Sequence, residues 1–286
     1  MPNQNPQAYI NRIKKIFSPS ITKVDLHDGG DDFLVLEINS EWMFRFPRNA
    51  ASQNALEQEI TFLSKFNDLS PLRIPDYQYI GDNFAGYAKI HGSQLSEELF
   101  QGLSKSTQAE IAQRMGKFLS ALYNFPVTEA TKLGIKEAWG GLHHKSGIAF
   151  LELVAPQLSS SARKRSMLCM VELLAEKFED KVIHGDFYFP DHVFFDESQN
   201  ELGVIDFGDT TLYDPAHDFQ CIVEIGGEDF FESVWNHYED QNDSTLLKRS
   251  RARLRARPLF VAGYIFANGL EDQYSTRLAR IEADFS

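Results

Sequence analysis

The sequence predicts an α+β protein of two lobes, a small β-rich N-terminal lobe over residues 1–91 and a larger, mainly helical C-terminal lobe over residues 92–286. Strand-like apolar runs separated by turn residues fill most of the first lobe. Apolar residues at helical spacing dominate the second. The chain's 286 residues exceed the commonest size of a single domain, which favours two lobes with a cleft between them.

The first lobe is expected to combine a small sheet with two helices. Apolar residues at helical spacing predict one helix over residues 6–17 and another over residues 52–66. The strands expected in this lobe cover residues 21–27, 33–38, 42–46, 76–80 and 86–90. Gly-Gly-Asp-Asp and Asn-Ser connect the first three strands, and both connections are typical of hairpins. His91-Gly92-Ser93 interrupts the pattern, and we place the lobe boundary there.

The second lobe is expected to be helical on both sides of a short β segment. Helices are predicted over residues 107–123, 147–156 and 161–178, and again along the tail from residue 218 to residue 284. Strands interrupt them between residues 182 and 206. The basic run Lys248–Arg257 alternates with small residues and is expected to form a solvated helix face.

Composition narrows the function classes. Hydrophobic residues make up 43% of the chain and charged residues 24%, which is typical of a globular protein. No apolar run approaches the ~18 residues of a membrane span, and the N-terminus lacks the features of a signal peptide, so we expect no membrane partner. Cys169 and Cys221 lie far apart without ligand-like spacing, which favours reduced thiols in a cytoplasmic protein.

The net charge of −13 is unevenly distributed along the chain. Residues 1–92 carry 9 Lys and Arg against 11 Asp and Glu, whereas the remainder carries 19 against 30. An acidic C-terminal half argues against a nucleic-acid partner and is compatible with a cationic ligand. Solubility alone would explain the same charge equally well.

Residues 182–218 hold the side chains that indicate chemistry. Asp186 stands in a His-Gly-Asp turn, and His192 comes just before a short apolar strand. Asp206 follows at the end of another apolar strand and is itself followed by Phe-Gly. A proton acceptor beside a divalent-cation site is what phosphoryl transfer to a hydroxyl needs, because its main problems are positioning and charge neutralisation.

The segments VIHGDF, HVFFD, LGVIDFGD and DPAHDF together resemble the aminoglycoside and macrolide phosphotransferases, antibiotic-resistance kinases with a protein-kinase-like fold. The nearest similarity is to aminoglycoside 2″-phosphotransferases, which have Phe-Lys-Phe-Pro-Lys where this chain has Phe44-Arg45-Phe46-Pro47-Arg48. The similarity runs from about Asp25 to Glu224. It implies a transferase that uses ATP or GTP as phosphoryl donor with Mg²⁺. It does not fix the acceptor, because choline and homoserine kinases share the scaffold.

The resemblance implies a role for each chemical residue of the segment. Asp186 takes the catalytic position, where a carboxylate accepts the proton of the substrate hydroxyl. Asp206 matches the acid that holds magnesium. Relatives place a metal-binding Asn or His five residues after the catalytic acid, whereas His192 follows Asp186 by six. Either His192 is the ligand and the loop bulges near Pro190, or Asp191 takes the metal.

The nucleotide contacts are expected in the small lobe and the linker. Arg45 aligns with the family's phosphate-binding Lys, and Glu59 in the following helix is its expected partner. Backbone groups around Gly29 and Gly30 would lie over the phosphates. In the segment that resembles the interlobe linker, the backbone groups of Ala88 and Ile90 would pair with the purine edge, and Tyr87 would stand at the back of the base pocket.

Several other polar residues of the second lobe have mainly architectural expectations. We interpret His184 as a structural residue of the loop, Asp209 as a turn cap or an indirect helper, Asp214 as a helix-start residue and Asp218 as a brace for the loop. The acceptor pocket is expected from the helices after residue 218. Candidate acids there are Glu224, Glu228 and Asp229, although surface charges would have the same appearance.

The sequence therefore favours a small-molecule kinase that phosphorylates a hydroxyl of an aminoglycoside-like or related compound. We expect a nucleoside triphosphate and a small acceptor as its ligands, and a monomer or weak dimer. Arg45 and the extra loop residue favour one alternative, a nucleotide-binding pseudokinase. A kinase of another metabolite, of macrolide, choline or homoserine type, is the other. A protein kinase is disfavoured because no Ala-Pro-Glu follows Asp206.

Overall fold

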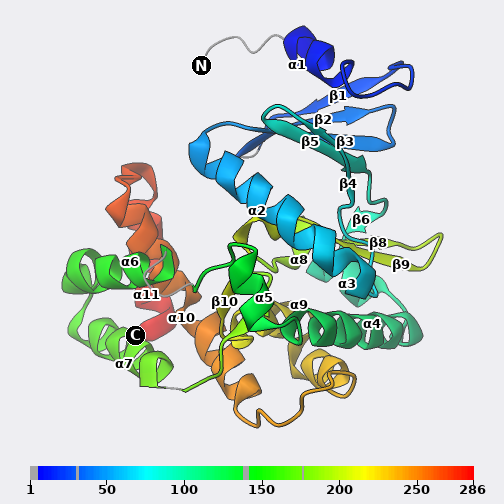
Figure 1. Cartoon of the computed structure of the whole chain (residues 1–286). Helices are drawn as coiled ribbons and strands as arrows, with labels where there is room; N and C mark the ends of the chain where they lie inside the picture. The colour runs from blue at the N-terminus through cyan, green and yellow to red at the C-terminus, as the bar shows by residue number, and fades with distance from the viewer. Residues whose placement is uncertain (1–5, 30–31, 138–141, 176) are drawn as a thin grey trace.

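The structure is a computed structural model that describes residues 6–29, 32–137, 142–175 and 177–286. A five-stranded antiparallel sheet with strand order β1-β2-β3-β5-β4 forms the upper part of Figure 1. Its strands are β1 (Val24–His27), β2 (Phe33–Ile38), β3 (Trp42–Pro47), β4 (Tyr77–Gly81) and β5 (Phe84–Ala88). Helix α1 (Pro6–Ile13) covers the outer face of this sheet, where Ile13 and Phe17 join a small apolar core with β2 and β3.

Turn chemistry in the sequence explains the register of this sheet. Asn39 and Ser40 have positive φ angles of 56° and 60°, the conformation that a two-residue hairpin turn needs. Asn tolerates this conformation because its short polar side chain bonds locally, and the Asn39 Oδ1 accepts from the Thr22 backbone N–H at 2.8 Å. With the turn fixed, β2 and β3 pair from Phe33 opposite Pro47 to Ile38 opposite Trp42.

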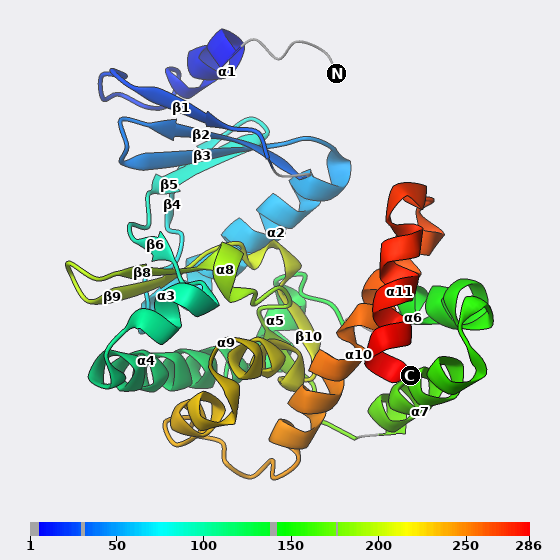
Figure 2. The same ribbon diagram turned by 180° about the vertical axis from the view of Figure 1, so that it is seen from behind.

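Helix α2 (Ala50–Phe66) links the sheet to the second lobe. Asn49 caps its start by accepting a hydrogen bond from the Ser52 backbone N–H at 2.9 Å. The helix runs diagonally from the sheet to the helical region in Figures 1 and 2. Its apolar face packs on the main core through Phe62 and Phe66, while Glu59 is buried on the same helix. The helix therefore fixes an acid at the level where the two lobes meet.

The second lobe contains two small antiparallel sheets, which its helices surround. One pairs β7 (Lys181–Ile183) with β10 (Thr211–Tyr213), and the other has the order β6-β8-β9. The bounds of the latter strands are Ser93–Gln94, Val193–Asp196 and Glu201–Val204. The helices that lead to and surround these sheets are α3 (Glu97–Gly102), α4 (Lys105–Tyr123), α5 (Val127–Lys132), α8 (Phe189–His192) and α9 (Ala216–Trp235).

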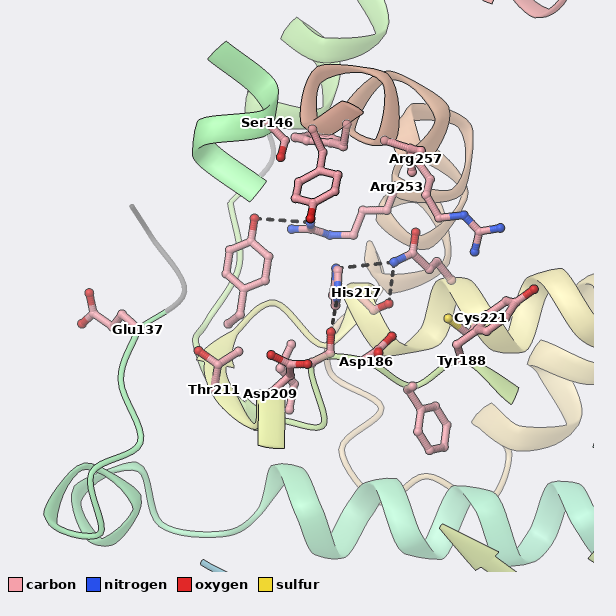
Figure 3. Close-up of a pocket in the computed structure, with 18 residues that line it drawn as sticks. Glu137, Ser146, Asp186, Tyr188, Asp209, Thr211, His217, Cys221, Arg253 and Arg257 are labelled. Atoms are coloured by element: carbon pink, nitrogen blue, oxygen red, sulfur yellow. Dashed lines mark hydrogen bonds between the residues drawn. The ribbon is translucent and has the colours of Figure 1, made fainter. Parts of the chain in front are cut away.

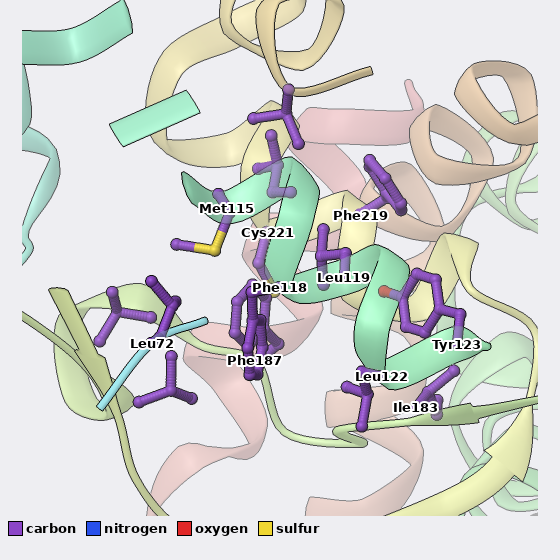
Figure 4. Close-up of a cluster of buried hydrophobic side chains, with 14 of the residues drawn as sticks. Leu72, Met115, Phe118, Leu119, Leu122, Tyr123, Ile183, Phe187, Phe219 and Cys221 are labelled. Carbon is purple, nitrogen blue, oxygen red and sulfur yellow. The ribbon is translucent and has the colours of Figure 1, made fainter. Parts of the chain in front are cut away.

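The main core of the lobe lies along α4. Met115, Phe118, Leu119 and Leu122 are fully buried on one face of this helix, as their helical spacing predicted. Figure 4 shows them packed against side chains of the catalytic segment and α9, including Phe187. The main core therefore packs behind the loop that carries Asp186 and supports this loop.

A second, separate core lies to one side of the lobe. It is formed by α6 (Leu142–Ala149), the π-helical turn Phe150–Val154, α7 (Ser160–Ala175), the second half of α10 (Leu246–Ala267) and α11 (Tyr274–Phe285). In Figure 1 these helices form the group that α10 connects to the rest of the molecule. Helix α10 packs on α6 at Gly263, where an added Cβ would meet the Ser146 carbonyl oxygen at 1.9 Å. Only glycine lets the two helices approach this closely.

The predicted α+β class is confirmed, and most predicted elements are present with shifted ends. The strand expected at residues 86–90 begins at Phe84 and ends at Ala88, whereas α3 and α5 were not predicted. The prediction of a solvated face for the basic run is wrong for Arg249 and Arg253, which are buried. The lobe boundary at residues 91 and 92 stays a prediction, and it falls between β5 and β6. Within the described residues, no helix is long and apolar enough to cross a membrane.

Candidate active site

The loop after β7 is set by close packing around Gly185. This residue has φ +88°, and a Cβ there would lie 2.1 Å from the Asp209 carbonyl oxygen, so the site requires glycine. The buried His184 donates from Nε2 to the Ile205 carbonyl at 3.0 Å, while its Nδ1 accepts from the Asp186 backbone N–H at 3.3 Å. Burial lowers the pKa of His184 to about 3. The imidazole is therefore neutral and holds the loop. This agrees with the prediction that His184 has a structural role.

Asp218 holds the same loop from the start of α9. Its carboxylate accepts from the backbone N–H groups of His184 at 2.8 Å and Gly185 at 3.1 Å. The Tyr123 hydroxyl donates to it at 3.2 Å. The side chain is fully buried, and burial raises the pKa of Asp218 to about 7 against the opposing effect of these hydrogen bonds. The expectation of a loop-bracing carboxylate agrees with these contacts.

The carboxylates of Asp186 and Asp206 converge on the ring of His192. The Asp186 Oδ2 lies 3.7 Å from His192 Nδ1, and the Asp206 Oδ2 lies 3.7 Å from Nε2. Nδ1 also donates to the Asp186 backbone carbonyl at 2.7 Å. Because a carbonyl oxygen only accepts, Nδ1 carries a proton, and Nε2 is the ring nitrogen that faces Asp206.

The pKa values of the two acids are shifted in opposite directions. Burial raises the pKa of Asp186 above its usual value. Burial also acts to raise the pKa of Asp206, but the charges of Arg45 and His192 outweigh it, so the net shift is downward. Asp206 has φ +67°, a left-handed conformation that Asp adopts more readily than most residues. This turn directs the carboxylate away from the strand and toward the other lobe.

The extra residue between Asp186 and His192 is accommodated in the one-turn helix α8. Pro190 lies in the first turn of this helix, where proline is well tolerated. The turn is closed by the His192 backbone N–H, which donates to the Tyr188 carbonyl at 2.9 Å. The structure places His192 between the two carboxylates, whereas Asp191 precedes it on the same turn and is exposed.

Arg45 joins the small lobe to Asp206. Its guanidinium donates to Glu59 at 2.6 Å, to the Tyr77 hydroxyl at 3.2 Å and to Asp206 Oδ1 at 2.8 Å. It also lies 4.0 Å over the ring of Phe33. Burial opposes the charge of Arg45, but Glu59, Tyr77 and Asp206 outweigh it, and the pKa of Arg45 is raised. The planar guanidinium of Arg45 thus contacts three partners at once. A lysine ammonium in its place would not reach all three in one plane.

The remaining nucleotide candidates lie along the edge of the small lobe. Gly29 follows β1 and has open space around it, while Gly30 lies outside the described residues. Tyr87 is buried on β5, with its ring 5.2 Å from that of Tyr77. Ala88 pairs with Trp42 at the end of β5. The side chain of Ile90 packs against Gly203, where an added Cβ would come within 2.2 Å of it.

A cavity of about 730 Å³ opens beside Asp186 in the second lobe. Figure 3 shows Asp186 and Asp209 on one side of it and two arginines of α10 on the other. Its lining is completed mainly by aromatic and small side chains from the catalytic loop, β10, α6, α9 and α10, among them Tyr188, Thr211, Tyr213, Ser146, Cys221, Phe260 and Tyr264. The expectation of a pocket built by helices after residue 218 agrees with this lining, although β10 and α6 also contribute.

Sequence reasoning missed the two arginines of this cavity. Arg253 is buried and donates to Asp214 Oδ2 at 2.9 Å, and Arg249 donates to the other oxygen of Asp214 at 2.8 Å. Arg257 lines the cavity and pairs with Glu224 of α9, with one contact at 2.6 Å. The available signal was the four-residue spacing of positions 249, 253 and 257, which places them on one helix face.

The three acids predicted for the acceptor pocket have different surroundings in the structure. Glu224 pairs with Arg257, which lines the cavity, while Glu224 is not itself a lining residue. Glu228 pairs with Arg251 of α10, and both side chains are largely exposed. Asp229 is exposed. His217, which was not predicted as a site residue, donates from Nε2 to the Gly185 carbonyl at 2.9 Å and also lines the cavity.

A two-lobed α+β fold with a paired carboxylate and imidazole beneath a buried Arg–Glu pair defines a phosphotransferase of protein-kinase-like architecture. The sequence model of the phosphotransferase enzyme family matches residues 25–259. The chain therefore belongs to this family, and it is a phosphotransferase that uses an alcohol group as acceptor. The resemblance inferred from the motifs is confirmed.

Solved structures agree over almost the whole chain. The GDP complex of aminoglycoside 2′-phosphotransferase-IIIa superposes with a TM-score of 0.87 at 25% identity, covering 98% of both chains. The GDP and kanamycin complex of APH(2″)-IIIa gives a TM-score of 0.85 at 25% identity, covering 97% of this chain and 98% of the other. Macrolide 2′-phosphotransferase type I, at 17% identity and a TM-score of 0.70, covers 100% of this chain and 98% of its own and shares the fold.

Proposed function

We propose that this protein transfers the γ-phosphoryl group of GTP or ATP to a hydroxyl of an aminoglycoside-like small molecule. The observation that carries the proposal is the convergence of Asp186, His192 and Asp206 beside a cavity large enough for such an acceptor. Similarity to a kanamycin-bound structure at 25% identity supports the acceptor class.

In this proposal Asp186 is the catalytic base. Its carboxylate lines the cavity and is about half exposed, so an acceptor hydroxyl has access to it. It accepts a hydrogen bond from that hydroxyl and takes its proton as the oxygen bonds to phosphorus. The brace from Asp218 and the contact from His217 to Gly185 keep the carboxylate in place.

Asp206 and His192 are the residues that would hold Mg²⁺. The donor set fits the ion, because Mg²⁺ is often bound by only one or two carboxylates plus substrate phosphates, and the Nε2 atom of His192 faces the Asp206 carboxylate. Bound Mg²⁺ neutralises charge on the nucleotide phosphates. His192 is favoured over Asp191 because it lies between both acids.

Arg45 is proposed to bind the nucleotide phosphates, with Glu59 holding it in place. Backbone groups near Gly29 and Gly30 would cover the phosphates, and those of Ala88 and Ile90 would pair with the purine. Tyr87 would limit the space behind the base. Its burial beside Tyr77 and the GDP complexes of the similar structures support GTP as the preferred donor.

A second acceptor class has one observation in its favour. Much of the cavity lining is aromatic or apolar, including Tyr188, Phe260 and Tyr264. Such a wall suits an acceptor with a large apolar body, as in a macrolide. A panel that contains both compound classes separates the two.

Asp186→Asn tests the proposal directly. With γ-labelled GTP and a panel of aminoglycosides and macrolides, the wild type should label one class. The variant should lose a factor of about 10²–10⁴ in kcat, because general-base catalysis contributes that much. Its affinity for GTP should stay the same, since the base does not touch the nucleotide in this proposal.

Asp196→Asn is the matched control for this test. Asp196 caps a surface turn by accepting from the Ser198 backbone N–H at 3.0 Å, away from the cavity lining. Its kcat should equal that of the wild type. Unchanged turnover in Asp186→Asn would refute the role of the base.

A further inference from the structure

The acceptor cavity has two ends of different charge. Asp186 and Asp209 line one part of it, and Glu137 lies apart from them in Figure 3. Burial and the neighbouring charges of Asp186 and Asp206 raise the pKa of Asp209 to about 6, which indicates that the acids lie within electrostatic range of one another. This end attracts a cationic group, and the reacting hydroxyl must also lie here, next to Asp186.

The opposite end carries arginines whose charges are already compensated. Arg253 is fixed by Asp214 through two hydrogen bonds, of 3.1 and 2.9 Å. Arg257 reaches Glu224 with two guanidinium nitrogens, so the pair is bidentate. Its guanidinium also lies 5.8 Å from the ring centre of Tyr188, a residue of the catalytic loop that lines the cavity. The remote end is therefore close to neutral and largely aromatic.

Glu224 would change the charge of this end if Arg257 were removed. The Glu224 side chain is 30% exposed and the Arg257 side chain 36% exposed. Without its partner, Glu224 would present an uncompensated carboxylate beside the cavity. An ion pair between partly exposed side chains contributes only a modest free energy. Removal of Arg257 should therefore change the relative affinity for charged and uncharged ligands by a small but measurable factor.

We propose that Arg257 determines acceptor specificity by neutralising Glu224, which confines the acceptor's amino groups to the end of the cavity near Asp186 and Asp209. The inference rests on the proposed function, because it assumes that the acceptor occupies this cavity. It assigns the substrate class more narrowly. The acceptor is a hydroxyl compound with its cationic group near the reacting hydroxyl and an uncharged remote part that packs on Tyr188, Phe260 and Tyr264.

The test compares the binding of two compounds with one skeleton and different charge. The dissociation constants of kanamycin and of its fully N-acetylated derivative are measured by calorimetry for the wild type and Arg257→Gln. In the variant, the affinity for kanamycin relative to that for the acetylated derivative should rise by about three- to five-fold, because Glu224 becomes available to an ammonium group. Loss of packing at Tyr188 would weaken both compounds alike and leave the ratio unchanged.

Two further variants make the result specific. Glu224→Gln combined with Arg257→Gln should return the ratio to the wild-type value. Arg251→Gln is the matched control, since Arg251 pairs with Glu228 between the same two helices but outside the cavity lining, and it should leave the ratio unchanged. The shift in Arg257→Gln should also shrink as salt rises from about 0.01 M to about 1 M, where the Debye length falls to about 3 Å.

The possible results separate this inference from the proposed function. An unchanged ratio in Arg257→Gln, or failure of both compounds to bind any variant, overturns the inference. A shifted ratio without phosphate transfer to any acceptor by the wild type supports the role of Arg257 in binding and contradicts the proposed activity. Phosphate transfer with an unchanged ratio does the opposite.

Discussion

His192 uses its two ring nitrogens differently. Nδ1 donates to the Asp186 carbonyl, which fixes the ring and directs Nε2 toward Asp206. Groups that orient a ligand in this way raise its affinity for a metal. The one-turn helix α8 makes this possible despite the longer loop, because it absorbs the extra residue before the histidine.

His192→Ala should therefore raise the Mg²⁺ concentration needed for half-maximal activity by about 10- to 100-fold. Asp191→Asn should leave it unchanged, because Asp191 is exposed, whereas His192 lies between the paired acids. Activity titrations with Mg²⁺ measure both. The reverse ranking of the two variants would identify Asp191 as the ligand.

Asp218 should make stability depend on pH. Its pKa is raised from 3.8 to about 7 in the folded protein, mainly by burial. A raised pKa means that the folded state binds the proton more tightly than the unfolded state. The contribution is thus fully present below about pH 4 and is lost as pH rises through about 7, by up to about 1.4 kcal/mol per pH unit.

Urea unfolding of the wild type and Asp218→Asn at pH 5, 6 and 7 checks this expectation. The free energy of unfolding should fall more steeply with pH in the wild type, because the amide does not titrate. Parallel pH profiles for the two proteins would show that the carboxyl of Asp218 has an ordinary pKa.

The candidate reacting acids were predictable from sequence because each follows an apolar strand within a short motif. Asp186 and Asp206 each follow an apolar strand, and the structure brings them to the same imidazole. The pocket arginines were not predicted. Their partners Asp214 and Glu224 lie 33 or more positions away in sequence, so only the packing of α9 and of the residues just before it on α10 brings them together.

Among the elements, α10 has the tightest packing constraint. An added Cβ at Gly263 would meet the Ser146 carbonyl at 1.9 Å and the Phe150 backbone N at 2.8 Å. Gly263→Ala should destabilise the protein by about 1–3 kcal/mol, because α6 must move away. It should also weaken acceptor binding, since Ser146 lines the cavity. Thermal unfolding and calorimetry with the acceptor measure the two effects.

Gly102→Ala on α3 is the control for this substitution. Nothing lies within 4 Å of a Cβ at Gly102, so the alanine should be neutral or stabilise the helix by up to about 1 kcal/mol. Equal stability of the two variants would show that α6 and α10 tolerate a wider spacing.

Element prediction succeeded where pattern and turn chemistry agreed. The strands β2 and β3 were predicted within one residue, because two largely apolar runs meet at an Asn-Ser turn. Helices α3 and α5 have six residues each, too few to show a helical period. The buried face of α10 was misjudged because its arginines are satisfied by acids on other elements rather than by water.

At the scale of the whole molecule, Arg45 and Asp206 link the two lobes directly at 2.8 Å. The proposed donor site uses both residues, so nucleotide binding should stabilise the protein as a unit. GTP with Mg²⁺ at about 100 times its Kd should add about 2.7 kcal/mol to the free energy of unfolding. ATP at the same concentration should add less if Tyr87 restricts the base pocket as proposed.

Thermal shift measurements with each nucleotide test this expectation. Asp206→Asn should lose the part of the shift that depends on Mg²⁺, and Tyr87→Ala should bring the shifts for ATP and GTP closer together. A larger shift for ATP than for GTP in the wild type would contradict the proposed donor preference.

The two separate apolar cores have an evolutionary consequence. The candidate reacting groups pack on the core along α4, whereas one part of the cavity wall belongs to α6 and α10, which pack on the other core. Substitutions in the side group of helices can reshape the wall without disturbing the chemistry. Proteins that descend from one ancestor with this fold can therefore acquire new acceptor molecules through substitutions in these helices, away from the residues that react.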